Sequence, residues 1–498
     1  MKKNYLIGID VGTSGTKSVL FDTSGCTVAS ATWEYPMEQP QNGWAEQDPA
    51  HWWTAVTATL SKITAAATDG DIVGIGLSGQ MHSLVLLDKD NRVLRPSILW
   101  CDQRTARECE EIEAIVGHDR LIEITANPAL TGFTASKIRW VQKNEPQIYE
   151  KCAHILLAKD YIRFLLTGQY ATEVSDASGM QLLDVKNRCW SPEVCSALSV
   201  DASLLARVYE SAEITGYVTE TAARLTGLPA GIPVAGGGGD NACAAIGTGV
   251  CRDGKAFTTI GTSGVVFAHT STPIIDPKGR IHTFCAAVPG TWHVMGVTQS
   301  AGLSLNWFRR SFAEDLSYQT IDAECEKLPI GADRLLYLPY LMGERTPVLD
   351  ADARGAFIGL SAMHTKFHLA RAVIEGISYS LCDCLSVLKE VGITPSEMAL
   401  CGGGAKSAFW HTMLTDLYGI PVHTMQSGEG AALGAAILAG VAAGVYPSVE
   451  AGCDAATKKN APRLPSEDAH ERYMQLYGIY QRLYPALKET FQGLKHCE

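Results

Sequence analysis

Two aspartates stand next to glycine-rich turns, and these residue types together suit chemistry on a phosphate group. Asp10 ends an apolar run and precedes Gly-Thr-Ser-Gly at residues 12–15, and Asp240 follows four glycines at 236–239. Turn amides form a concavity that binds phosphate, a nearby carboxylate attracts Mg²⁺, and a carboxylate in a cleft serves as a general base toward a hydroxyl. Four glycines in a row also indicate a backbone that approaches a ligand. The alternatives are a strand-end turn residue for Asp10 and a helix N-cap for Asp240.

The sequence Gly-Thr-Ser-Gly occurs a second time at residues 261–264, about half a chain after the first copy. Each copy lies between two β-rich runs, so each predicts a β-hairpin whose glycines take the dihedral angles of a tight turn. Two such copies indicate two similar domains whose hairpins face each other and hold a polyphosphate from both sides. Asp10 corresponds to Thr259 in the second copy, so only the first hairpin is expected to hold Mg²⁺. The alternative is two turns with a structural role alone.

The first hairpin differs from a P-loop. That motif needs four residues between its glycines and a lysine directly after the second glycine. Here two residues intervene, and Thr16 separates Gly15 from Lys17. The turn also leads into a strand instead of a helix. No GxGxxG sequence opens a helix at this place, which disfavours a dinucleotide-binding fold.

Two further clusters carry groups suited to ligand binding. Residues 402–404 are three glycines between a strand-like run and a helix, where bare backbone suits a nucleotide, although a helix entry turn looks the same. Residues 80–82, Gln-Met-His, follow an apolar strand, and Trp100 and Asp102 stand near the next strand end. Polar groups beside an indole suit a polyol. The alternatives are a core histidine at His82 and a helix cap at Asp102.

Length and composition restrict the function classes. The chain has 498 residues, of which 46% are hydrophobic and 19% charged, as in an ordinary globular protein of several domains. Its net charge of −12 and its lack of a basic run disfavour nucleic acids and anionic membranes. Its 15 cysteines are scattered without a CxxC pair or a signal peptide, which favours reduced thiols in the cytoplasm over disulfides or zinc. Residues 431–446 are uncharged but too short to span a membrane, and we expect a buried helix with close backbone contacts.

The order of predicted elements favours an α/β fold with mixed sheets. A third strand is predicted over residues 26–35, directly after the first hairpin. A helix is predicted over residues 49–67, with Asp48 as its N-cap and Pro49 at its first position. Further helices are expected over residues 102–116, 241–249 and 467–492.

These glycine motifs, with several other segments, resemble the FGGY carbohydrate kinases, within the sugar kinase/heat-shock/actin ATPase superfamily. The resemblance covers essentially the whole chain. It implies two similar actin-like, ribonuclease H-like ATPase domains, residues 1–248 and 249–498, that face a central cleft. The segments that carry it outside the glycine motifs are 43–49 (GWAEQDP), 79–82 (GQMH), 99–100 (LW), 132–141 (GFTASKIRWV), 338–341 (LPYL), 343–347 (GERTP), 355–360 (GAFIGL) and 368–376 (HLARAVIEG).

The resemblance also implies a role for each matching position. Asp240 matches the catalytic base, and Asp10 matches the acid near the metal and the phosphates. Met81 and His82 stand where glycerol kinases carry Arg-Glu, which argues against glycerol as the substrate. The expected sugar-binding residues are Gln80, Met81, His82, Trp100, Asp240 and Asn241. The expected ATP-binding residues are Gly12, Thr13, Ser14 and Lys17, then Gly261, Thr262 and Ser263, and at the adenosine Gly403, Gly404 and Ala405.

The activity that the resemblance implies is phosphorylation of a sugar by ATP with Mg²⁺ as cofactor. Segments 43–49, 79–82 and 343–347 point within the family to D-xylulose, converted at its 5-hydroxyl to D-xylulose 5-phosphate. The expected partners are the sugar and ATP, without nucleic acid or membrane, in the cytoplasm. Homodimers are common among metabolic enzymes of this size, but no residue demonstrates one. The alternatives are a family kinase for another pentulose, a ketohexose or gluconate, and a non-catalytic ATP-binding switch protein.

Overall fold

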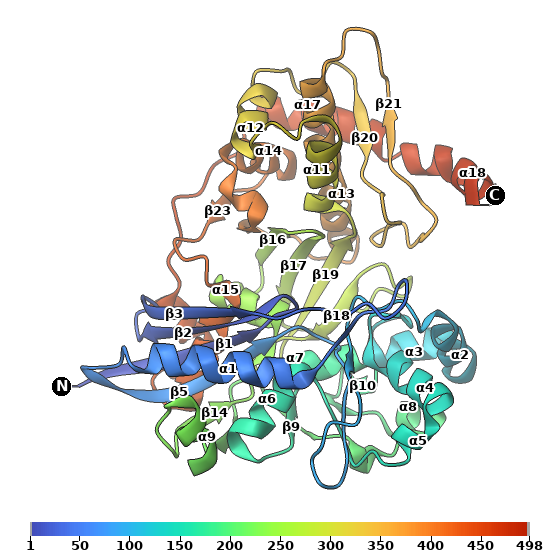
Figure 1. Cartoon of the computed structure of the whole chain (residues 1–498). Helices are drawn as coiled ribbons and strands as arrows, with labels where there is room; N and C mark the ends of the chain where they lie inside the picture. The colour runs from blue at the N-terminus through green and yellow to red at the C-terminus, as the bar shows by residue number, and fades with distance from the viewer. Residues whose placement is uncertain (1, 496–498) are drawn as a thin grey trace.

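The computed structural model describes residues 2–495, and its first sheet is built around the first predicted hairpin (Figure 1). The strands are β1 (Lys3–Val11), β2 (Gly15–Asp22), β3 (Thr27–Glu34), β5 (Gly70–Gly79), β13 (Ile214–Tyr217) and β14 (Pro233–Ala235). The antiparallel meander β1-β2-β3 agrees with the predicted third strand. On the other side of β1, β5 runs parallel to it and β14 parallel to β5.

The second sheet repeats this arrangement. Its strands are β16 (Lys255–Ile260), β17 (Gly264–Thr270), β18 (His282–Cys285), β19 (Trp292–Thr298), β22 (Glu397–Gly402) and β23 (Val422–Thr424). The order β19-β17-β16-β22-β23 has the same strand directions as β3-β2-β1-β5-β14. The prediction of two similar domains, drawn from the repeated Gly-Thr-Ser-Gly, is therefore confirmed.

The hairpin glycines are required for a different reason from the one predicted. None of the glycines at 12, 15, 261 and 264, all within the described chain, has a positive φ. A Cβ atom on Gly15 would lie 2.7 Å from the carbonyl oxygen of Trp33, and one on Gly264 would lie 2.7 Å from side-chain atoms of Leu381. The prediction of unusual turn dihedrals was wrong, and at Gly15 and Gly264 the missing side chain allows close packing of the hairpins instead.

Helix α1 (Pro49–Thr64) covers the strands β2 and β3. The carboxylate of Asp48 accepts a hydrogen bond from the amide of Ala50 at 2.9 Å, which confirms the predicted N-cap. The helix ends three residues before the predicted position. The amides of Ala66 and Ala67 bond to carbonyls three residues back, which tightens and closes the last turn.

Two helices in close contact join the two parts of the molecule. They are α10 (Asp240–Gly247) and α15 (Gly430–Ala442), and α15 also lies against β1 and β5. A Cβ atom on Gly434 would lie 1.8 Å from the carbonyl oxygen of Cys243, and one on Gly8 would lie 1.8 Å from that of Ala432. The prediction for residues 431–446, a buried helix with close backbone contacts, is therefore confirmed. Among residues 2–495, no helix is both long and apolar enough to cross a membrane.

The contacts of α15 bear on the division into domains. This helix belongs to the second half of the sequence, yet it packs on the first sheet. Its residues share one hydrophobic cluster with Leu6 and Phe21 of the first sheet and with Ile246 of α10. The chain therefore returns to the first part after the second sheet. The division at residue 248 stays a prediction.

The C-terminal helix predicted over residues 467–492 is two helices. They are α17 (Glu467–Tyr480) and α18 (Leu483–Lys495). Pro485 has no N–H group to donate to the carbonyl of Gln481, and it lies in the first turn of α18, where a proline is tolerated. The predicted helical stretch is present, with an interruption at residues 481–482.

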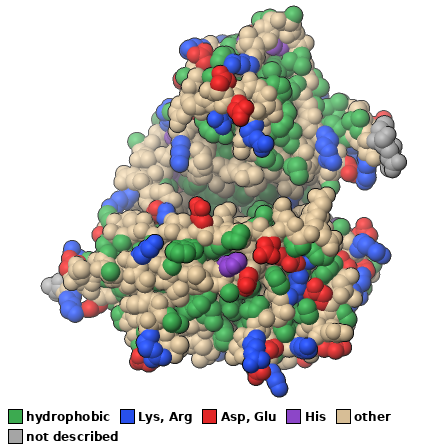
Figure 2. Space-filling model, viewed as in Figure 1, with side chains coloured by type: hydrophobic (Ala, Val, Ile, Leu, Met, Phe, Trp, Pro, Cys, Tyr) green, Lys and Arg blue, Asp and Glu red, His purple; other side chains and the backbone are tan. Residues whose placement is uncertain are grey.

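The remaining elements complete the two parts, and the surface is hollowed between them (Figure 2). In the first part they are β4 (Glu46–Gln47), β6 (Val85–Leu87), β7 (Ser97–Ile98), α2 (Ala106–Val116), α3 (His118–Thr125), α4 (Thr134–Asn144), α5 (Pro146–Tyr149), β8 (His154–Leu156), α6 (Ala158–Thr167), β9 (Ala171–Glu173), α7 (Val174–Ala177), β10 (Leu183–Asp184), β11 (Cys189–Trp190), α8 (Pro192–Ala197), β12 (Arg207–Tyr209), α9 (Glu220–Thr226) and β15 (Gly238–Gly239). In the second part they are α11 (Ala301–Phe312), α12 (Tyr318–Glu326), β20 (Leu336–Leu338), β21 (Ala356–Ile358), α13 (Lys366–Glu390), α14 (Ala408–Tyr418) and α16 (Val449–Ala456).

The cysteines within residues 2–495 carry free thiols. This agrees with the predicted reduced state. Cys497 lies outside the described residues.

The contact between α15 and α10 gives a test of the joint. We expect Gly434→Ala to lower the free energy of unfolding by about 1–3 kcal/mol, because the added methyl group overpacks a backbone contact. Gly478→Ala in α17 is the matched control, since a Cβ atom there meets nothing within 4 Å. Alanine is the better helix former, so the control should be neutral or stabilising. Urea unfolding measures both, and a Gly434→Ala protein as stable as wild type would contradict the contact.

Candidate active site

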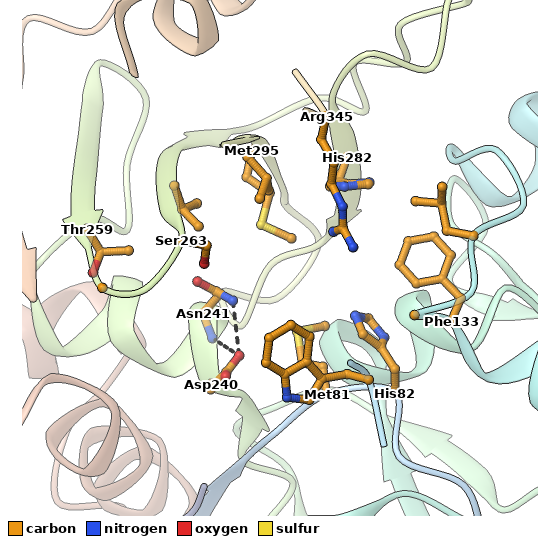
Figure 3. Close-up of a pocket in the computed structure, with 16 residues that line it drawn as sticks. Met81, His82, Phe133, Asp240, Asn241, Thr259, Ser263, His282, Met295 and Arg345 are labelled. Atoms are coloured by element: carbon orange, nitrogen blue, oxygen red, sulfur yellow. Dashed lines mark hydrogen bonds between the residues drawn. The ribbon is translucent and has the colours of Figure 1, made fainter. Parts of the chain in front are cut away.

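A cavity of about 270 Å³ lies between the two parts and collects most of the predicted sugar-binding residues (Figure 3). The predicted residues that line it are Met81, His82, Trp100, Asp240, Asn241, Gly261 and Ser263. Sequence reasoning missed several others, among them Phe133, His282, Met295 and Arg345. Phe133 and Arg345 lie in segments that carried the family resemblance, so a signal existed for them. His282 and Met295 lie in β18 and β19, where no motif marked them.

Asp240 is the first residue of α10 and opens into this cavity. Burial, together with the negative charge of Asp10, raises the pKa of its carboxyl group to about 7. Its Oδ1 accepts hydrogen bonds from the amide of Asn241 at 2.7 Å and from the side chain of Asn241 at 3.0 Å. The N-cap of α10 is Gly239, so the helix-cap alternative for Asp240 was wrong. A carboxylate with a pKa near neutrality is suited to take a proton.

The glycines before Asp240 approach the protein itself and not a ligand. A Cβ atom on Gly237, whose φ is +71°, would lie 1.9 Å from the carbonyl oxygen of Leu77. One on Gly239 would lie 2.8 Å from the side chain of Met81. The interpretation of residues 236–239 as backbone held bare for a ligand is corrected accordingly. Residues 238–239 form β15, which pairs with β5, and residues 236–237 lead into it. This tight packing sets the position of Asp240.

A buried network of charged residues is hydrogen-bonded to β15 and to Gly236 before it. Ser175 accepts a hydrogen bond from the amide of Gly239 at 3.1 Å and donates one to Glu173 at 3.0 Å. Arg163 donates to the carbonyl of Gly236 and, at 2.7 Å, to Asp160. The charged members of this network are fully buried, so a misplaced partner would leave an unpaired charge. The network therefore fixes the strand that carries Asp240. Its further members are Lys159 and Asp176.

His82 combines a strained backbone with a fixed side chain. Its φ is +69°, which is rare for a residue other than glycine. Its Nδ1 lies 3.0 Å from the carbonyl oxygen of Gly179, and its own carbonyl accepts from Lys137 at 2.9 Å and from Thr134 at 3.1 Å. Burial lowers the pKa of the imidazole well below its usual value, so the ring is neutral. Because Nδ1 donates to a carbonyl, Nε2 is left as an acceptor in the cavity wall.

Gln80 and Asp102 lie outside the lining of the cavity, and the assignment of Gln80 to the sugar is corrected. Its side chain donates to Gln47 at 3.0 Å and accepts from Thr13 at 3.1 Å, so it is used to hold the first hairpin. Trp100, which does line the cavity, donates to the same Thr13 hydroxyl at 2.9 Å. Asp102 accepts hydrogen bonds from Arg104 and from the amide of Ala45, a structural role. Thr105, not Asp102, is the N-cap of α2.

The first hairpin turns its carbonyl groups into the protein. The carbonyl of Gly12 accepts from the Tyr35 hydroxyl at 2.6 Å, that of Thr13 from Gln47 at 2.7 Å, and that of Ser14 from the Tyr35 amide at 3.3 Å. The amides of Thr13 and Ser14 donate no hydrogen bond within the described chain. Two free amides at the tip of a turn form a site for an anion such as phosphate.

The second hairpin is held by different contacts, and its equivalent amides are also free. The carbonyl of Gly261 accepts from the amide of Gly302 at 2.8 Å, and that of Thr262 accepts from Leu303 at 3.1 Å, so the start of α11 holds this turn. In the part of the chain that the structure describes, the amides of Thr262 and Ser263 donate to no group. Both copies of Gly-Thr-Ser-Gly therefore present the same two amides, as the repeat predicted.

A second cavity, of about 420 Å³, lies on the other side of the second hairpin. Of the three residues predicted to contact the adenosine, Gly403 and Gly404 line this cavity, whereas Ala405 packs against the hydrophobic core and does not. Gly261 lines both cavities, so the second hairpin separates them. Among the lining residues that sequence reasoning missed are Asn306, Tyr318, Gln319, Asp322, Ser407 and Trp410.

Asp10 lies at the end of β1, opposite Lys17 in β2. Burial raises the pKa of its carboxyl group, and its Oδ1 has no hydrogen-bond partner within residues 2–495. An orphaned carboxylate oxygen near a second carboxylate is the kind of hard donor that Mg²⁺ takes. The ammonium of Lys17 forms an ion pair of 2.6 Å with Glu429, directly before α15, so its predicted role toward ATP stays a prediction.

The pair of carboxylates gives a test that needs no substrate. In protein free of metal and nucleotide, we expect the carboxyl group of Asp240 to titrate with a midpoint near 7. Asp10→Asn should lower this midpoint, because it removes a negative charge that disfavours ionisation. Carbon-13 NMR of aspartate-labelled protein measures the midpoint, with Asp240→Asn to assign the signal and the exposed Asp468→Asn as control. A midpoint near the ordinary value of about 4 would contradict the electrostatics described here.

Comparisons with known proteins agree with this architecture. Residues 5–247 match the N-terminal domain, and residues 256–443 the C-terminal domain, of the FGGY family of carbohydrate kinases. The chain is 38% identical over 493 residues to a xylulose kinase of Bacillus subtilis, covering 99% of both proteins.

Two solved structures from Lactobacillus acidophilus, a ligand-bound xylulose kinase and a gluconate kinase, each match with a TM-score of 0.94 and 29% identity, over 99% of this chain and 100% of theirs. On its sequence, its two repeated sheets and its paired cavities, the chain belongs to the FGGY family of carbohydrate kinases.

Proposed function

We propose that the protein is a cytoplasmic kinase that transfers the γ-phosphoryl group of ATP to the 5-hydroxyl of D-xylulose. The observation that carries the phosphoryl transfer is the pair of hairpins with free central amides, one of which, at Gly261, lines both cavities. The choice of D-xylulose is supported by the relatives named xylulose kinase, which align with nearly the whole chain.

In the proposed reaction, Asp240 accepts the proton of the sugar hydroxyl. As the proton leaves, the O5–Pγ bond forms and the bond from Pγ to the bridging oxygen breaks, so that the electron pair departs with ADP. The free amides of Thr13, Ser14, Thr262 and Ser263 stabilise the charge on the phosphoryl oxygens. The raised pKa of Asp240 supports its role as the base, since proton transfer is efficient when the pKa lies near the working pH.

Asp10 is the residue proposed to hold Mg²⁺. Within residues 2–495, no three metal-ligating side chains form a cluster, which fits an ion that takes one or two carboxylates and completes its shell with water and phosphate oxygens. When bound, Mg²⁺ neutralises charge on the phosphates. The orphaned Oδ1 of Asp10 supports this assignment.

The larger cavity is proposed to take the adenosine, with Gly403 and Gly404 beside it. The polyphosphate then passes the second hairpin toward Asp240. Closure of the two domains, residues 1–248 and 249–498, excludes water during the transfer. The interval between the two family matches, which end at 247 and begin at 256, supports this division. Lys17 and Ala405 remain predicted contacts of ATP.

Removal of the proposed base tests the mechanism. We expect Asp240→Asn to lower sugar-dependent kcat by about 10²–10⁴-fold while ATP still binds, because the amide cannot accept the proton. An assay of ADP release with D-xylulose measures turnover, and calorimetry with ADP measures binding. Asp468→Asn, at the exposed start of α17, is the matched control. Near-normal sugar-dependent ADP release by Asp240→Asn would overturn the assignment.

A panel of sugars tests the choice of substrate. We expect the highest kcat/KM with D-xylulose and lower values with other pentuloses, ketohexoses and gluconate. Gluconate is included because a gluconate kinase is among the structural matches. A preference for gluconate or a ketohexose in the ADP-release assay would replace D-xylulose as the substrate. ATP turnover that no sugar alters would favour the non-catalytic switch protein.

A further inference from the structure

The first cavity has a second polar end, away from the phosphate side. Figure 3 shows Asn241 and Ser263 on one side, and Arg345 and His282 next to each other on the other. The guanidinium of Arg345 lines the cavity and forms no hydrogen bond or ion pair with any residue in the described chain. A cation withdrawn from water needs a compensating partner. The geometry therefore leaves this group for a ligand.

The neighbouring His282 is fixed as a hydrogen-bond acceptor. Its Nδ1 lies 2.8 Å from Oδ1 of Asn127. The amide nitrogen of Asn127 donates to the carbonyls of Thr125 at 2.9 Å and Thr283 at 3.0 Å, so only its oxygen is left to face the histidine. Nδ1 of His282 must therefore carry the proton, and Nε2 holds a lone pair. Burial, with the nearby charge of Arg345, lowers the pKa of the ring to about 3, so it stays neutral.

This end of the cavity thus offers one group that only donates and one that only accepts. Arg345 can donate to a carbonyl oxygen but can accept nothing, and Nε2 of His282 can accept from a hydroxyl but can donate nothing. A carbonyl with a hydroxyl on the next carbon satisfies both.

The chemistry of a 2-ketopentose supplies such a pair only in one form. Ring closure of a pent-2-ulose uses its 5-oxygen, so a free 5-hydroxyl exists together with a free carbonyl at C2 in the open chain. This step rests on the proposed function, in which the 5-hydroxyl is the acceptor. The open chain places C1 and C2 at the end of the molecule opposite the reacting hydroxyl.

We propose that Arg345 and His282 are the specificity-determining pair that recognises the ketol end of the open-chain sugar. Arg345 donates to the C2 carbonyl, and His282 accepts from the C1 hydroxyl. Asp240 at the other end then receives the 5-hydroxyl. The pair positions the substrate and favours a ketose over an alditol, which lacks the carbonyl.

The test combines protein variants with substrate analogues. We expect Arg345→Met to lower kcat/KM about 100-fold with D-xylulose and with 1-deoxy-D-xylulose, and far less with xylitol, which has no carbonyl. We expect His282→Phe to lower it about tenfold with D-xylulose and xylitol but not with 1-deoxy-D-xylulose, which has no C1 hydroxyl. Arg472→Met, on the exposed side of α17, is the control for loss of an arginine. Arg345→Lys should restore part of the activity.

A measurement without turnover checks the same contact. In infrared spectra of D-xylulose labelled with carbon-13 at C2, bound together with ADP, the carbonyl band should shift to lower frequency in wild type and in His282→Phe, but not in Arg345→Met. Melting temperature and ADP affinity confirm that the variants fold. If Arg345→Met does not fold, Arg345→Lys is compared in its place and should show a smaller shift.

The outcomes separate this proposal from the proposed function. The recognition of the ketol is overturned if Arg345→Met or His282→Phe lowers kcat/KM by the same factor on all three substrates. It is also overturned if the carbonyl band is the same in Arg345→Met as in wild type. If wild type fails with D-xylulose but phosphorylates another ketose, the proposed substrate is wrong and the same comparison on that ketose and its analogues decides for the pair. If wild type prefers a sugar acid, both proposals are overturned.

Discussion

The geometry of the site depends on a backbone contact between two helices that only glycine permits. Gly434 of α15 lies against the carbonyl of Cys243 in α10, and Gly247 of α10 lies against the carbonyl of Gly430. The helix α10 begins at Asp240. The helix α15 begins directly after Glu429, which forms an ion pair with Lys17 of the first hairpin. Any side chain in this contact would separate the helices and with them the two hairpins. Close packing at the joint thus sets how near the two hairpins lie to each other.

The charged groups in and beside the cavity suit charged or polar ligands. Burial raises the pKa of both Asp10 and Asp240 above that of a free aspartate. The negative charge of Asp10 also contributes to the raised pKa of Asp240. A cation relieves this repulsion, and a proton from a hydroxyl relieves it as well. His82 and His282 stay neutral, so Arg345 is the charge that faces the other end of the cavity. In a poorly solvated cleft, such charges act strongly on a ligand.

The two halves share one turn with free central amides and differ in the contacts that hold it. The first hairpin is held by the side chains of Tyr35 and Gln47, and the second by the amides at the start of α11. Both arrangements leave the central amides free. Asp10 in the first sheet corresponds to Thr259 in the second, so only the first hairpin carries a carboxylate. The cavity of about 420 Å³ is lined by residues of the second half alone. The repeated fold thus carries different surroundings on either side of the cleft.

The sequence alone determined the features that depend on neighbours in the chain. The repeated Gly-Thr-Ser-Gly predicted both hairpins, and the strand ends and glycine runs marked Asp10, Asp240 and the Met81-His82 pair. Only the tertiary structure decided which of these side chains share a cavity. In that structure Gln80 lies outside the first cavity, whereas Arg345 and His282 line it, although both are more than a hundred positions away from Met81. Packing between two sheets sets such distances, and no local pattern of residues records them.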